Sequence, residues 1–162
     1  YQARHNDRSK LVQIGAAVVA VAGVPVLRDV MEEFIMDGSL YKIESKHEAR
    51  MFAANLFRAT KKCMEESAGK VEELAQAGFI IATPRHIFNV QTDLSCFDCD
   101  TYCAKGAGVE PCMGAIEVLY HSKMAPDEIL KQALTATCKI NPYCSEPIEI
   151  VDVAKGIRCR HD

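Results

Sequence analysis

The longest stretch of the chain without a charged residue is LVQIGAAVVAVAGVPVL, residues 11–27, which is apolar apart from Gln13. Apolar and polar positions do not alternate with a 3.6-residue period, so a helix made from this stretch would offer no face to water. Such a helix would rise roughly 25 Å, slightly less than a hydrocarbon core of about 30 Å. The pattern predicts a transmembrane helix with its extension over residues 11–36. A buried soluble segment and a signal-peptide remnant are the alternatives.

The charges that flank this stretch predict its orientation. Arg4, Arg8 and Lys10 lie in a polar arm over residues 1–10, whereas RDVMEEFIMDG, which follows, carries four acidic residues against one arginine. The positive-inside rule then places the arm on the cytoplasmic, matrix or stromal side. Residues with compact side chains recur at spacings of three and four and predict a face for close packing against partner helices. They are Gly15, Ala16, Val19, Ala20 and Gly23.

Residues 39–162 have the patterning of a helical domain, so the fold class is expected to be mainly α. Ser45 and Glu48 fit a capping box at the start of an amphipathic helix. APDEILKQALTATC, with Pro126 in its first turn, predicts a second helix. FIIATPRHIFNVQTDL is expected to be extended and broken at Pro84. The segment KGAG is expected to be a turn, and PIEIVDVAKG a final helical turn or two.

Eight cysteines are the most unusual feature of the composition, and seven of them lie between Cys96 and Cys159. An even, clustered set is typical of a disulfide framework in an oxidising compartment, although eight cysteines allow 105 pairings. We therefore expect the C-terminal domain in a periplasm, another extracytoplasmic space, an intermembrane space or a lumen. The disulfide candidates are Cys63, Cys96, Cys99, Cys103, Cys112, Cys138, Cys144 and Cys159.

A metal site is the alternative interpretation of the same thiols. An iron–sulfur cluster or a zinc ion would need four converging ligands, for which the candidates are Cys96, Cys99, Cys103 and Cys112. The spacing C-x2-C-x3-C is not the ferredoxin pattern, and the acidic side chains between these thiols oppose an anionic thiolate site. The sequence therefore favours disulfides, and no cofactor is expected.

Charge and motifs exclude several functions. The net charge is −3 and the isoelectric point about 6.0, so no basic field exists to attract nucleic acid. The five histidines are scattered, and no nucleophile–base pattern or glycine-rich phosphate loop is present. The sequence therefore predicts that the chain is not an enzyme.

These expectations combine into one functional hypothesis and two alternatives. The hypothesis is a non-catalytic accessory subunit of a membrane enzyme complex, with other membrane subunits and the lipid bilayer as its partners. The first alternative is a soluble electron-transfer module that binds a metal or an iron–sulfur cluster. The second is a helical, disulfide-rich lipid- or ligand-binding domain. For the latter, the segment from Cys112 to Cys144 is similar to a cysteine-tied hairpin of saposin-like lipid binders, although the cysteine order of the whole chain differs.

Overall fold

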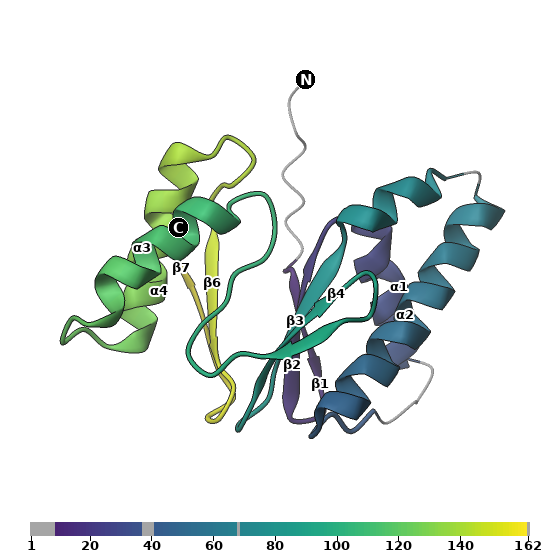
Figure 1. Cartoon of the computed structure of the whole chain (residues 1–162), viewed down its shortest axis with the longest axis horizontal. Coiled ribbons are helices and arrows are strands. Elements are labelled where there is room, and N and C mark those ends of the chain that lie inside the picture. Colours follow the sequence, from purple (N-terminus) through teal and green to yellow (C-terminus); the bar gives the residue numbers. More distant parts are fainter. Residues whose placement is uncertain (1–8, 37–40, 68, 162) are drawn as a thin grey trace.

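A computed structural model describes residues 9–36, 41–67 and 69–161. Two helices, a five-stranded antiparallel sheet, a two-stranded sheet and a second pair of helices form four successive layers (Figure 1). The strands of the large sheet, in spatial order, are β1 (Leu11–Ile14), β2 (Ala17–Ala22), β3 (Gly78–Ala82), β4 (Ile87–Gln91) and β5 (Cys96–Asp98). The small sheet pairs β6 (Ile148–Asp152) with β7 (Ile157–His161). The fold is therefore mixed α/β, and the expected mainly α class is wrong.

The apolar stretch over residues 11–27 forms a β-hairpin instead of a membrane helix. Strands β1 and β2 pair antiparallel around Gly15, whose φ of 58° suits a tight hairpin turn. After Gly23, which also has a positive φ, helix α1 (Pro25–Met36) begins. Within the described residues no helix is long and apolar enough to cross a membrane, so the predicted transmembrane helix is wrong.

The predicted helix-packing face is also wrong, because its members serve a hairpin. Gly15 and Ala16 make the turn, while Val19 and Ala20 alternate between the two faces of β2. Strand β2 lies inside the sheet, between β1 and β3. Its two faces are both covered: Val18 is 6% exposed and Val19 is fully buried. A strand covered on both sides needs no polar alternation, which is why its sequence resembles a membrane span.

Helices α1 and α2 (Lys46–Glu66) cover one face of the large sheet and enclose the main core with it (Figure 1). The predicted capping box is confirmed: the Ser45 hydroxyl accepts from the Glu48 amide, and the Glu48 carboxylate accepts from the Ser45 amide. The rings of Phe57 on α2 and Phe79 on β3 pack with centroids 4.9 Å apart. A 3₁₀ helix, η1 (Val71–Gln76), leads into β3.

The other half of the chain packs on the opposite face of the sheet. Helices α3 (Val109–Tyr120) and α4 (Pro126–Ile140) form a hairpin around Ile116 and Ala133, and β6–β7 lie between this hairpin and the large sheet (Figure 1). The helix predicted from Pro126 is confirmed, as is the extended segment that is broken near Pro84. The helical turn expected for PIEIVDVAKG is wrong, because these residues form β6 and the turn after it.

Candidate functional site

Backbone from three parts of the chain converges at one end of the large sheet, which we call the glycine junction: Ala22, Gly23, Ala77, Gly78 and the loop 105–108. A side chain at Gly106 would lie 3.7 Å from the Ala22 methyl group, so the loop passes next to the end of β2. A side chain at Gly23 would come within 2.6 Å of the Ala77 backbone. The positive φ values of Gly23 (110°) and Gly106 (106°) likewise favour glycine. Gly106 and Ala107 are exposed, so this backbone is accessible from solvent.

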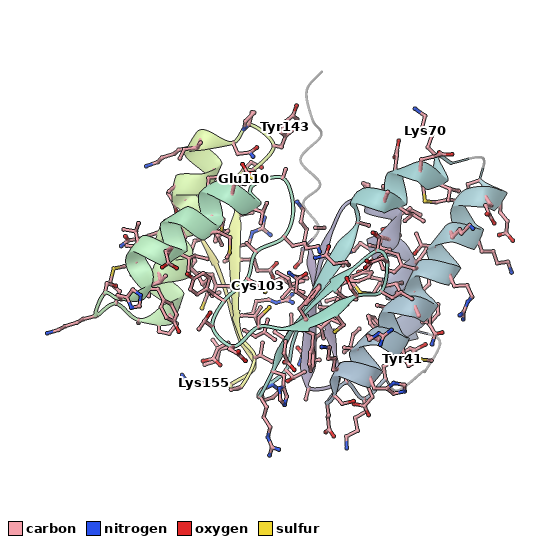
Figure 2. All side chains as sticks on the ribbon, viewed as in Figure 1. Tyr41, Lys70, Cys103, Glu110, Tyr143 and Lys155 are labelled. Atoms are coloured by element: carbon pink, nitrogen blue, oxygen red, sulfur yellow. The ribbon has the colours of Figure 1, made fainter. Side chains whose placement is uncertain are left out.

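Lys105 connects the loop to the sheet. Its ammonium donates to Asn89 Oδ1 at 3.1 Å and to Gln91 Oε1 at 2.5 Å, both on β4. Figure 2 shows Cys103, two residues earlier, in the segment that runs between the large sheet and α3. Burial lowers the pKa of Lys105, while the charges of Cys103 and Asp93 act in the opposite direction. The amine is therefore partly desolvated and directed at polar groups of the sheet.

The far side of the loop is anchored to α4 and the segment after it. Asn141 Nδ2 donates to the Ala107 carbonyl at 2.8 Å. A side chain at Gly108 would lie 2.5 Å from the Thr137 methyl group and 2.7 Å from Cys144 Sγ. The loop is thus held between the large sheet and the helical hairpin, and it leads directly into α3.

Two helices begin at the glycine junction. Helix α1 starts two residues after Gly23, and α3 starts immediately after Gly108, which provides no side-chain cap. The first-turn amides of a helix lack intrahelical acceptors and carry partial positive charge. Here Pro25 and Pro111 have no N–H, and Leu27 and Val109 already donate to the carbonyls of Val24 and Gly106. The first-turn amides to which the positive charge belongs are therefore those of Val26 and Glu110. This end of the sheet is therefore suited to binding a carbonyl oxygen or an anionic oxygen.

A second polar cluster joins the two sheets near the start of β1. The Ser9 hydroxyl donates to the Glu149 carboxylate on β6, and Arg158 Nε on β7 lies 3.1 Å from the same carboxylate. Arg158 also donates to the Leu11 carbonyl at 3.2 Å. Arg28 on α1 donates to the Ser9 carbonyl and pairs with Glu32 at 2.8 Å. These bonds fix the segment that enters β1.

Lys10 lies at the same end of the sheet as the glycine junction. Its carbonyl accepts from the Val21 amide at 3.2 Å, one residue before Ala22. The side chain is exposed, and among the described residues its ammonium pairs with no carboxylate. By contrast, the cationic groups of Arg28 and Lys105 are bonded to neighbouring side chains.

All eight cysteines are free thiols, so the predicted disulfide framework is wrong. Burial is the main cause of the raised pKa of Cys96, Cys112 and Cys138, and it raises the pKa of Cys103 to about 12, helped by a hydrogen bond with Cys99. Thiols with raised pKa values stay protonated at neutral pH and pack as small apolar groups. The prediction of an oxidising compartment depended on the disulfides and the membrane helix, so it is wrong as well.

The predicted metal ligands do not form a site in the structure. Cys112 contacts Thr137 and lies near Cys144 in the helical hairpin. The thiols of Cys99 and Cys103, by contrast, form a hydrogen bond with each other beside the sheet. Across the described ranges no three His, Cys, Asp or Glu side chains are placed to hold a metal ion. Proximity in the sequence, as in LSCFDCDTYC, therefore did not indicate a shared ligand shell.

No protein-family model matches the sequence, and no curated protein does. The fold, however, matches solved structures. BPH from Thiobacillus denitrificans, determined in complex with epoxomicin, superposes with a TM-score of 0.73 and 18% identity over 87% of this chain and 76% of that one. Anbu (ancestral beta-subunit) from Yersinia bercovieri superposes with a TM-score of 0.66 and 12% identity, over 93% of this chain and 72% of that one. HslV from Trypanosoma brucei superposes with a TM-score of 0.55 and 18% identity, over 85% of this chain and 76% of that one.

These neighbours show that the chain has a proteasome-type fold. The hypothesis of a membrane accessory subunit is therefore wrong, and so is the expectation of a lipid bilayer and membrane subunits as partners. The expectation that the chain is not an enzyme is overturned too, because its fold matches those of BPH, HslV and Anbu. Identities of 12–18% establish the fold alone.

Sequence reasoning missed the glycine junction. The turn-like KGAG segment was the available signal for the loop. Gly23 gave no such signal, because it was interpreted as part of a membrane-helix face. The contact between Gly106 and Ala22 joins residues more than eighty positions apart, which periodicity cannot reveal.

Proposed function

We propose that this chain is a subunit of a proteasome-type peptidase that hydrolyses amide bonds within an assembly of similar subunits. The fold likeness to BPH, over 87% of this chain at a TM-score of 0.73, carries the proposal. Anbu and HslV structures support it, because they share the same layers of helices and sheets with this chain at TM-scores of 0.55–0.66. The helical assembly of a further neighbour, the Anbu complex from Pseudomonas aeruginosa, supports the assembled state.

The glycine junction supplies one requirement of amide hydrolysis. The tetrahedral intermediate carries a negative oxygen, which backbone N–H groups fixed in advance stabilise strongly. The segment from Gly23 into α1 and the loop before α3 place two helix N-termini at one accessible end of the sheet. We assign the substrate carbonyl to this junction.

Lys10 is the candidate proton-transfer group. Amide hydrolysis needs a group that donates a proton to the leaving amine, and an ammonium can do so. Lys10 lies beside the end of β2, and its ammonium is exposed. Because Arg28 and Lys105 are bonded to other side chains at this end, Lys10 is the described cation that is available for chemistry.

The experiment measures hydrolysis of fluorogenic peptide amides at pH 7.5 by the wild-type protein, the Lys10→Ala variant and the Lys123→Ala control. Lys123 is exposed in the turn between α3 and α4. Loss of a general acid typically costs about 10²–10⁴-fold in rate, so the rate of Lys10→Ala should fall by at least about 100-fold while Lys123→Ala keeps the wild-type rate. Epoxomicin, the ligand of the BPH complex, should inhibit the wild-type protein. A wild-type protein without hydrolysis, or equal rates in both variants, would contradict the proposal.

A further inference from the structure

We propose that Lys105 is a positioning residue that holds the loop 105–108 in the geometry required at the glycine junction. The part of this inference that concerns catalysis rests on the proposed peptidase function, whereas the part that concerns the loop does not. Lys105 does not contact a bound group in this account. It acts through the backbone of the residues that follow it.

Two hydrogen bonds of the Lys105 side chain join the loop 105–108 to the large sheet. The residue lies just before Gly106, yet its ammonium bonds to two side chains on β4, Asn89 and Gln91. Those two side chains also interact with each other, with Gln91 Nε2 3.4 Å from Asn89 Oδ1. The loop is therefore attached to the end of β4 through a side chain as well as through its own backbone.

The path of the Lys105 side chain depends on a glycine. Gly78 is paired with Gln91 in the sheet, and a side chain there would lie 2.2 Å from Lys105 Cε and 2.8 Å from Lys105 Nζ. The space above Gly78 is thus occupied by the lysine chain itself. The Lys105 side chain passes directly over Gly78 and bonds to two acceptors. Its conformation is therefore fixed, unlike that of a surface lysine with free rotamers.

The groups around the amine are polar but carry little charge. Desolvation lowers the pKa of Lys105, and the opposing contributions come from Cys103 and Asp93. The Cys103 thiol, with its pKa raised to about 12, is neutral at physiological pH. Asp93 is therefore the anionic group near Lys105 among the described residues, and the main ties of the amine are its hydrogen bonds to Asn89 and Gln91.

The hydrogen bonds of Lys105 to Asn89 and Gln91 determine where the backbone of the loop lies. Val109 donates to the Gly106 carbonyl at 3.1 Å, and Cys112 donates to the Gly108 carbonyl at 3.1 Å, so the loop and the first turn of α3 are one hydrogen-bonded unit. On the α4 side the unit is held by Asn141. Without Lys105, the sheet side of the loop would lose the two hydrogen bonds to Asn89 and Gln91. The loop could then move away from Gly23.

The test compares Lys105→Met, Lys105→Arg and Lys123→Met by amide hydrogen exchange and by steady-state hydrolysis. Met keeps the apolar chain of the lysine and removes the donors, whereas Arg keeps the charge and the donors. In Lys105→Met the Val109 amide, which donates to the Gly106 carbonyl, should exchange about tenfold faster, while the amides of β3 keep wild-type rates. Lys105→Arg should restore most of the protection, and Lys123→Met should match the wild type.

Hydrolysis separates positioning from general stability. If Lys105 positions the site, Lys105→Met lowers kcat with little change in KM, and Lys105→Arg recovers most of kcat. Unchanged exchange of the Val109 amide in Lys105→Met would overturn the inference whether or not the protein hydrolyses peptides. Faster exchange with an unchanged kcat would overturn the catalytic part of it. A wild-type protein without hydrolysis would refute the proposed function and leave the exchange result as the test of the loop.

Discussion

Gly78→Ala is the sharpest test of the packing at the glycine junction. The new methyl group would lie 2.2 Å from Lys105 Cε and 3.1 Å from the Val90 carbonyl oxygen. The first contact is far inside van der Waals distance, so the lysine chain has to leave its position. The second is tight, but a small shift of the strand relieves it. The effect of the substitution should therefore depend on whether Lys105 is present.

The magnitude follows from these contacts. Overpacking typically costs about 1–3 kcal/mol, and the displaced lysine loses two hydrogen bonds at about 0.5–1.5 kcal/mol each, less where water replaces them. The φ of Gly78 is not in the left-handed region, so alanine gains about 0.4–1 kcal/mol from the unfolded chain. We expect Gly78→Ala to destabilise the wild-type protein by about 1–3 kcal/mol. In a Lys105→Ala background it should change stability by less than about 0.5 kcal/mol.

The assay is a double-mutant cycle measured by urea unfolding, with Gly114→Ala as the matched control. Gly114 lies in α3, and a side chain there meets nothing within 4 Å. Its replacement should therefore stabilise both backgrounds by about 0.5–1 kcal/mol. An equal cost of Gly78→Ala with and without Lys105 would refute the described path of the lysine side chain.

Three further predictions concern the core, the thiols and a helix cap. Phe79→Ala, at a fully buried ring between β3 and α2, should cost about 3–5 kcal/mol in urea unfolding, and a loss below 1 kcal/mol would contradict the packing. Ellman titration of protein unfolded without reductant should count eight thiols, and fewer would indicate disulfides that the structure lacks. Hydrogen bonds lower the pKa of Glu48 in the folded state, so its stabilising effect is present above the unfolded pKa and is lost as pH falls through the folded one. Glu48→Gln should therefore lose less stability than the wild type between about pH 5 and 3, as thermal unfolding against pH would show.

Local signals in the sequence predicted local structure well. The capping box at Ser45 and Glu48, and Pro126 followed by acidic residues, each identified a helix that the structure contains. These signals depend on hydrogen bonds and charges within a few residues, so the surrounding fold hardly changes them.

The larger errors came from patterns that tertiary burial can imitate. Val18 and Val19 are both buried because β2 has a helix layer on one side and the β6–β7 layer on the other. Two-sided burial removes the polar positions that distinguish a strand from a membrane span. Likewise, Gly15 and Gly23 were interpreted by their size, whereas the structure uses their positive φ.

The cysteines illustrate the limit of composition. Their number and clustering suggested covalent bridges, but Cys96 and Cys112 are each less than 10% exposed and serve as ordinary core residues. Free cysteine is among the residue types most often buried. Only the three-dimensional packing distinguishes that role from a disulfide framework.

The measurement that most directly tests a peptidase site at the glycine junction is hydrogen exchange of the wild-type protein with and without epoxomicin. The account predicts slower exchange at residues 22–24 and 104–109, where β2 ends and the loop enters α3, with little change on the exposed face of α4. Absence of any protection, or protection confined to α4, would contradict it.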